Sequence, residues 1–158
     1  MSFTVYVPRD ASALSLGAEA VAHAVAAEAA RRNIDIKVVR NGSRGLYWLE
    51  PMVEVATPEG RVAYGPVQKA DIKALFDANF FEGGKHALSL GLTEEIDFLK
   101  NQQRLTFARV GIVDPRSLDD YRARGLTAPP PCTAAPVPPG SRQSPAAQRF
   151  LARGSPGP

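Results

Sequence analysis

Residues 39–55 constrain the fold of this chain more than any other stretch, because two apolar segments meet there across a short loop. The loop contains Gly42 and Gly45, and glycine permits backbone conformations with positive φ. It closes on Pro51, at the start of the next apolar segment, where proline presets the backbone and can adopt the cis form. Within this loop, no cysteine, histidine or acid precedes Glu50, so the loop supplies neither a thiolate nor a metal site.

Strand and helix patterns follow one another on both sides of this loop. Residues 3–7 alternate apolar and polar side chains, whereas the alanine-rich residues 13–32 repeat apolar side chains at helical spacing. The full set is strands at 3–7, 34–39, 52–56 and 61–64, and helices at 13–32 and 68–79. This β-α-β-β-β-α order predicts an α/β, thioredoxin-like domain over residues 1–81, in which the first two strands are parallel. Its core is predicted to contain Val5, Val21, Val25, Ile36, Val38, Val53, Val55, Ile72 and Phe76.

The pattern weakens after residue 81 and then disappears. Residues 82–125 are predicted to form an extended and helical linker, with a short helix at 94–101, Leu105 and Phe107 as apolar anchors, and Ser117 capping a last helix. The tail, residues 126–158, holds nine of the 14 prolines and no acidic residue. Such a composition cannot bury a core, so the tail is predicted to be disordered or polyproline-like.

Charge and composition exclude several classes of protein. All 16 acidic residues and 16 of the 19 basic residues lie within positions 1–125, so the body is neutral. A neutral body argues against nucleic-acid binding, which depends on a basic face. No stretch has the length of a membrane span or the pattern of a signal peptide, so a cytoplasmic location is expected. The single cysteine, Cys132, excludes a disulfide framework and receives no role.

The loop offers two candidate sites besides a plain turn. Gly42 and Gly45 have the spacing of a G-x-x-G clamp, and Arg40 and Arg44 would suit a phosphate, although a simple turn is the favoured interpretation. Tyr47 and Trp48, beside Pro51, could stack on a ligand, but packing in the core or at a subunit interface is favoured for aromatic side chains. The two histidines, His23 and His86, lack a second ligand at metal spacing.

Four segments carry a resemblance to a known family. They are residues 39–51, 62–67, 90–96 and, most strongly, 104–122, which reads Arg-Leu-Thr-Phe-Ala-Arg-Val-Gly-Ile-Val-Asp-Pro-Arg-Ser-Leu-Asp-Asp-Tyr-Arg. Residues 1–125 resemble the N-terminal part of the beta, or diaphorase, subunit of NAD-dependent molybdenum formate dehydrogenases. That subunit is related to the flavoprotein subunit of NADH dehydrogenase (complex I).

The resemblance implies what this chain has and what it lacks. The family's first domain resembles a thioredoxin-like [2Fe-2S] ferredoxin, and its motif places Ser43 and Tyr47 at two cysteine positions. No cluster is therefore expected, and the domain is expected to be a structural docking module with Tyr47, Trp48 and Pro51 as interface candidates. The parent family implies FMN, NAD and a [4Fe-4S] cluster, but the motifs for all three are missing here. Its partners are a molybdopterin-containing alpha subunit and a ferredoxin-like gamma subunit.

Two functions remain open at this point. The first is the N-terminal fragment of an oxidoreductase subunit, in a complex that passes electrons from formate through FMN to NAD, with no complete active site of its own. The second is a free-standing, redox-silent thioredoxin-like module for protein interaction. The abrupt change at Leu126, just after a capped helix, favours a truncated or frameshifted reading frame over an evolved tail.

Overall fold

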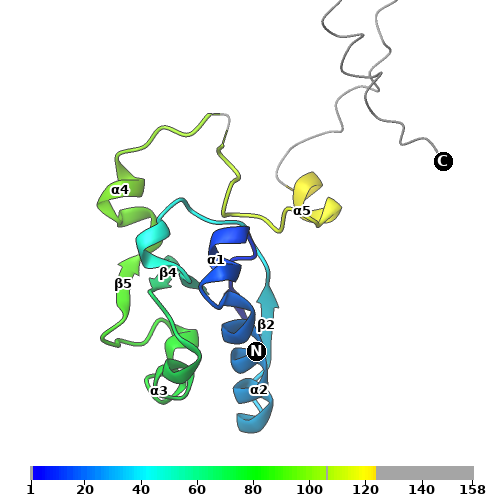
Figure 1. Cartoon of the computed structure of the whole chain (residues 1–158), viewed down its shortest axis with the longest axis vertical. Coiled ribbons are helices and arrows are strands. Elements are labelled where there is room, and N and C mark those ends of the chain that lie inside the picture. Colours follow the sequence, from blue (N-terminus) through cyan, green and yellow to red (C-terminus); the bar gives the residue numbers. More distant parts are fainter. Residues whose placement is uncertain (1, 106, 124–158) are drawn as a thin grey trace, which may run out of the picture. The chain divides into compact units, whose positions relative to one another are not determined.

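A computed structural model describes residues 2–105 and 107–123, so the predictions for the tail, its disorder and its altered reading frame lie outside the described residues. The described part contains a five-stranded sheet with strand order β2-β1-β3-β4-β5 (Figure 1). The strands are β1 (Phe3–Tyr6), β2 (Ile36–Val39), β3 (Val53–Thr57), β4 (Gly60–Tyr64) and β5 (Ser89–Leu92). Among the residues described, no helix combines the length and the apolar character needed to cross a membrane.

The connections confirm the predicted thioredoxin-like class. The helix α2 (Ala18–Arg32) joins β1 to β2, and these two strands pair in parallel, with Val5 opposite Val38. The hairpin β3–β4 is antiparallel and lies on the other side of β1. The helix α3 (Ile72–Asp77) follows the hairpin after a short 3-10 turn, η2 (Lys69–Asp71). The β-α-β-β-β-α order is therefore the one that the sequence predicted.

The prediction of one long helix at residues 13–32 is wrong in one respect, because the structure has two helices there. The first, α1 (Ala11–Ser15), begins at Asp10, whose Oδ1 accepts hydrogen bonds from the backbone N–H groups of Ser12 and Ala13 at 3.1 and 3.3 Å. Gly17 then adopts φ of +99°, a left-handed conformation that ends α1 before α2 begins. Glycine adopts this conformation without steric cost, so the break is encoded by that residue.

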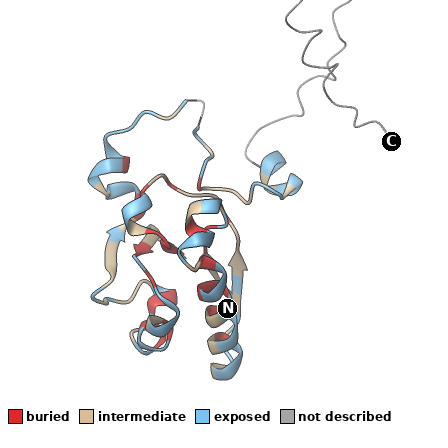
Figure 2. Cartoon of the chain, in the orientation of Figure 1, coloured by how far each residue is buried: buried red, intermediate tan, exposed pale blue. Residues whose placement is uncertain are grey.

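One face of the sheet packs against α2 and α3 and forms the main core (Figure 2). Seven of the nine predicted core residues are buried, which confirms the assignment of inward faces. Ile36 and Val38 are only partly buried and pack against the edge of this core. Both belong to β2, which lies at the edge of the sheet and has a neighbour on one side only.

The opposite face of the sheet carries a smaller apolar cluster of Leu46, Met52, Ala63 and Leu99. Leu46 comes from the loop before the 3-10 turn η1 (Tyr47–Leu49), and Leu99 comes from the short helix α4 (Asp97–Lys100). The strand β5, which the sequence pattern did not predict, pairs antiparallel with β4 and continues the sheet beyond residue 81. Two further 3-10 turns, η3 (Phe80–Glu82) and η4 (Thr93–Glu95), connect these parts.

The segment 102–113 is neither extended nor anchored by the side chains that the sequence suggested. Residues 102–104 have no regular secondary structure and residues 107–112 form turns. Leu105 and Phe107 are 90% and 66% exposed. The final helix, α5 (Leu118–Ala123), follows, and Ser117 caps it as predicted, because its Oγ accepts a hydrogen bond from the backbone N–H of Asp120 at 3.1 Å.

Candidate functional site

The loop of residues 41–50 forms a corner between β2 and β3 (the corner loop). Gly45 has φ of +85°, so the backbone turns there in a conformation that favours glycine. The turn η1 then carries Tyr47 and Trp48, and the Glu50–Pro51 peptide bond is cis, as the sequence allowed. Pro51 itself is buried at the start of the path into β3, so this interface candidate has little exposed surface.

Ser43, at the first of the two expected cysteine positions, takes part in a hydrogen-bond network inside the loop. Its Oγ donates to Oε1 of Glu50 at 2.6 Å and accepts from the backbone N–H of Gly45 at 2.9 Å. Glu50 is 5% exposed, and its second oxygen, Oε2, is buried with no partner among the described residues. Burial raises the pKa of Glu50 above its ordinary value, although the hydrogen bond from Ser43 opposes this shift.

Arg44 points inward and is held by two carboxylates. Its Nε and Nη2 atoms donate to the two oxygens of Glu54 at 3.0 and 2.9 Å, and Nη1 lies 2.9 Å from Oε1 of Glu94. The side chains of Arg44 and Glu54 are 4% and 1% exposed, so this ion pair is buried. Burial alone would lower the pKa of Arg44, but the hydrogen bonds and charges of Glu54 and Glu94 outweigh it and raise that pKa. The guanidinium of Arg44 is therefore fully engaged in contacts with Glu54 and Glu94 within the fold.

The other residues singled out by the sequence have ordinary partners. Arg40 pairs with Glu19 at 2.8 Å, so neither arginine of the G-x-x-G loop is unpaired for a phosphate. His23 is 79% exposed and lies 3.2 Å from the same Glu19. Nδ1 of His86 accepts a hydrogen bond from the backbone N–H of Leu88 at 3.1 Å. These contacts agree with the structural interpretation of each residue.

A segment from the end of the described chain lies across the corner (the crossing segment, residues 102–105 and 107–113). Four hydrogen bonds hold it. Nη2 of Arg104 donates to the carbonyl of Arg44 at 2.8 Å, and Nδ2 of Asn41 donates to that of Gly111 at 2.7 Å. Arg61 donates from Nη2 to the carbonyl of Ile112 at 2.8 Å and from Nη1 to that of Gly111 at 3.4 Å. The segment is therefore attached to the corner by backbone carbonyls and polar side chains.

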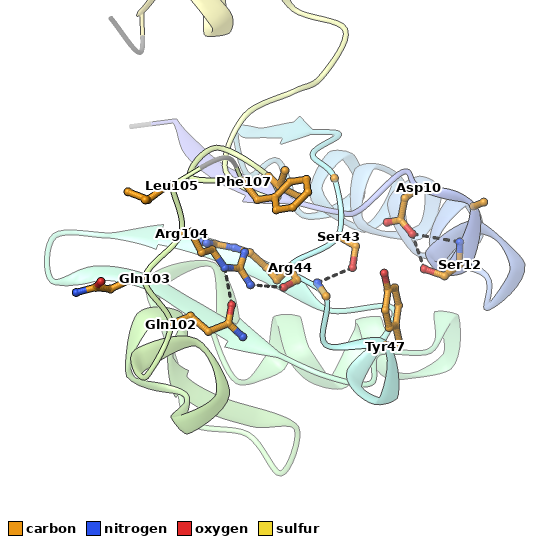
Figure 3. Close-up of a pocket in the computed structure, with 14 residues that line it drawn as sticks. Asp10, Ser12, Ser43, Arg44, Tyr47, Gln102, Gln103, Arg104, Leu105 and Phe107 are labelled. Carbon is orange, nitrogen blue, oxygen red and sulfur yellow. Dashed lines mark hydrogen bonds between the residues drawn. The ribbon is translucent and has the colours of Figure 1, made fainter.

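A groove of about 1040 Å³ lies between the corner loop and the crossing segment. In Figure 3, Asp10, Ser43 and Tyr47 lie on one side of the groove, and Leu105 and Phe107 lie on the other. Asp10 has one carboxylate oxygen, Oδ2, that is buried without a described partner. The groove therefore combines exposed apolar side chains with polar ones, among them Asp10, Gln102 and Arg104.

The two aromatic residues of η1 are both exposed, each with 62% of its surface accessible. Tyr47 faces the groove, whereas Trp48 contacts Phe98 of α4 in a T-shaped arrangement with ring centroids 5.2 Å apart. Phe98 is itself 45% exposed. The sequence pointed to Tyr47 and Trp48 but not to Phe98, since nothing in its local pattern distinguishes it from an inward-facing helix residue.

The residues at the expected cluster positions do not fit a [2Fe-2S] group. Ser43 and Tyr47 offer hydroxyls in place of thiolates, and the Ser43 hydroxyl is already bonded to Glu50 and Gly45. Within residues 2–105 and 107–123, three or more histidine, cysteine, aspartate or glutamate side chains do not gather where a metal could bind. No step of chemistry is therefore assigned to iron at this corner.

We expect that the purified protein binds no stoichiometric iron–sulfur cluster. The reason is that this corner supplies hydroxyls rather than thiolates to iron. Iron analysis and visible absorbance after anaerobic reconstitution would measure it, with a Ser43→Cys/Tyr47→Cys variant as the matched comparison. Stoichiometric cluster absorbance in the unsubstituted protein would contradict the expectation.

The raised pKa of Glu50 predicts a pH-dependent stability. Because the folded state holds the proton more tightly than the unfolded chain, this contribution is complete below the ordinary pKa of glutamate and is lost as pH rises through the folded value. We expect Glu50→Gln to lose less stability than the unsubstituted protein as the pH rises from below the ordinary pKa of glutamate towards neutral pH. Urea unfolding across this range is the measurement.

Ser43→Ala is the matched control for this experiment. It removes the hydrogen bond that lowers the pKa of Glu50, so the pH-dependent loss should move to higher pH. Parallel pH profiles for the unsubstituted protein and Glu50→Gln would show that Glu50 does not titrate in this way.

Comparison with known proteins gives a likeness among solved structures only. No protein-family model matches the chain, and no curated protein matches it. The crystal structure of the wild-type thioredoxin-like [2Fe-2S] ferredoxin from Aquifex aeolicus is 19% identical, with a TM-score of 0.47, over 56% of this chain and 96% of that chain. A second structure of a thioredoxin-like [2Fe-2S] ferredoxin from Aquifex aeolicus is 20% identical, with a TM-score of 0.47, over 56% of this chain and 90% of that chain. A cysteine-to-serine variant of that ferredoxin is 22% identical, with a TM-score of 0.45, over 56% of this chain and 98% of that chain.

Proposed function

We propose that this chain is a docking module, without its own redox centre, that corresponds to the N-terminal part of the beta subunit of an NAD-dependent formate dehydrogenase. In that role it would contact the molybdopterin-containing alpha subunit or the ferredoxin-like gamma subunit. FMN, NAD and a [4Fe-4S] cluster would belong to the rest of the parent subunit, where electrons from formate reach NAD. The four sequence segments at 39–51, 62–67, 90–96 and 104–122 support this assignment.

One observation carries the docking role. The interior of the corner is filled by the Ser43–Glu50 hydrogen bond and the Arg44–Glu54 ion pair, while Tyr47 and Trp48 remain exposed beside it. The Ser43 hydroxyl and the Arg44 guanidinium are committed to contacts inside the fold, whereas exposed aromatic side chains on an ordered turn are typical of the residues that dominate protein interfaces. The corner is thus better suited to binding a protein than to performing a reaction.

Co-expression with the alpha and gamma subunits of such a complex tests the proposal. We expect the chain to co-purify with at least one of them, and we expect Trp48→Ala to reduce the recovered complex about tenfold or more. The free energy of unfolding of the isolated chain should change little, because Trp48 is exposed. Failure of the unsubstituted chain to co-purify would favour the alternative, a free-standing interaction module. Equal loss of folding and assembly in Trp48→Ala would assign Trp48 to the core.

A further inference from the structure

The contact between Trp48 and Phe98 joins two elements that are far apart in sequence, the turn η1 and the helix α4. The two rings meet at 90°, with their centroids 5.2 Å apart, and both keep a large part of their surface exposed. Tryptophan and phenylalanine are among the residues that folded proteins bury most extensively. A pair of them on the surface, here called the aromatic pair, therefore marks a place where apolar area remains to be covered.

The aromatic pair rests on an ordered support. Leu46 lies two residues before Trp48, and Leu99 follows Phe98. Both are buried in the second apolar cluster, with 0% and 6% of their surface exposed. Leu49 and Ile96 pack against the same cluster. Because the backbone on both sides of the contact is anchored, a partner would not need to order these elements on binding. Preorganised aromatic side chains of this kind contribute most to affinity.

The charges around α4 select the chemistry of the partner. Glu94, Glu95 and Asp97 are all exposed, and Lys100 is the one basic residue between positions 93 and 101. Glu95 pairs with Lys100 at 2.6 Å and Glu94 with Arg44 at 2.9 Å, whereas Asp97 forms no ion pair with any residue that the structure describes. Three exposed carboxylates stand against one exposed basic side chain in this stretch, which leaves a negative excess beside the aromatic pair (the acidic rim, Glu94, Glu95 and Asp97).

We propose that the aromatic pair and the acidic rim together bind a lysine- or arginine-containing segment of a partner protein. A cationic side chain stacks favourably on an indole face, and tryptophan is the best aromatic partner for it. The rim carboxylates would attract the same side chain and steer its approach. A second copy of this chain is a poorer occupant, because symmetric contact would bring two acidic rims together. The inference rests on the proposed docking role and names the chemistry of the partner surface.

Trp48 is the only tryptophan of the chain, so its fluorescence reports directly on this surface. The full-length protein is titrated with a synthetic peptide of alternating arginine and leucine, and separately with a peptide of the same length in which glutamate replaces arginine. We expect the basic peptide to shift the Trp48 emission in a saturable way, with affinity that falls as salt increases. The acidic peptide should leave the emission unchanged.

Two variants and a matched control locate the binding. Phe98→Ala should lower the affinity of the protein for the basic peptide about tenfold. The triple variant Glu94→Gln/Glu95→Gln/Asp97→Asn should weaken it and flatten the salt dependence. The control triple Asp35→Asn/Glu59→Gln/Glu82→Gln removes the same number of exposed carboxylates from other elements, and it should bind as the unsubstituted protein does.

Three results would overturn the inference. The first is equal binding of the acidic peptide, and the second is equal weakening by the control triple, which would indicate general charge attraction. The third is a Trp48 emission that depends on protein concentration without peptide and becomes constant in Phe98→Ala, which would make a second copy the occupant. No basic-peptide binding, combined with co-purification that depends on Trp48, would reject the basic partner segment and leave the docking role intact.

Discussion

Replacing Arg44 with methionine is expected to lower the free energy of unfolding by about 3–5 kcal/mol, the loss typical when one partner of a buried ion pair is removed. Arg44 and Glu54 have 4% and 1% of their side chains exposed, and two hydrogen bonds join them. Without Arg44, the carboxylate of Glu54 would keep one partner among the residues that the structure describes, Arg61, whose Nη1 lies 3.4 Å away. Urea unfolding at neutral pH, followed by the fluorescence of Trp48, would measure the change.

The double variant Arg44→Met/Glu54→Leu is the informative control. Apolar side chains of similar volume remove both charges of the buried pair, so the double variant should recover most of the loss. Glu94→Gln should cost far less than Arg44→Met, because Glu94 is 67% exposed and its charge is screened by solvent. If the double variant were as unstable as Arg44→Met alone, packing of the arginine side chain, rather than the uncompensated charge, would explain the loss.

The strands and the main core could be predicted from the sequence because their side chains alternate with a regular period. Val53 and Val55 on β3 face the core as the pattern requires, whereas Glu54 between them has the position of a solvent-facing residue. It is buried because the corner loop brings Arg44 over this face of the sheet. No local pattern reports a contact between residues in different elements, so the ion pair could not be found from sequence.

The later elements show the same limit. The strand β5 has four residues and contains Gly91 with φ of +79°, so its pattern is too short and irregular to detect. The crossing segment is held by the backbone carbonyls of Gly111 and Ile112. Every residue has such a carbonyl, so the sequence does not mark the two that are used. Sequence reasoning instead looked for apolar anchors and chose Leu105 and Phe107, both of which are exposed.

The candidate site was partly accessible to sequence reasoning. Tyr47 and Trp48 could be singled out because two adjacent aromatic residues in a glycine-flanked loop are unusual for a turn. Phe98 and the acidic rim could not be linked to Trp48, because about 50 residues separate them and only the folded chain brings α4 to η1. Their role as an interface remains a prediction.

Replacing Gly111 with alanine is expected to release the crossing segment from the corner and to cost about 1–3 kcal/mol of stability, the range for a residue held in a left-handed conformation. Gly111 has φ of +78°, and a Cβ there would lie 2.5 Å from Cδ of Arg44 and 2.9 Å from the carbonyl oxygen of Ser43. The backbone must move away, which breaks the hydrogen bond from Asn41 to the Gly111 carbonyl.

Gly91→Ala is the matched control for Gly111→Ala, since Gly91 has φ of +79° but no atom lies within 4 Å of an added Cβ. Both variants carry the same backbone strain, and only Gly111→Ala adds the overlap with Arg44 and Ser43. Amide hydrogen exchange should therefore rise in residues 102–113 for Gly111→Ala and remain unchanged there for Gly91→Ala. Equal stability loss in the two variants, with unchanged exchange in the crossing segment, would mean that close packing of Gly111 on the corner does not hold this segment in place.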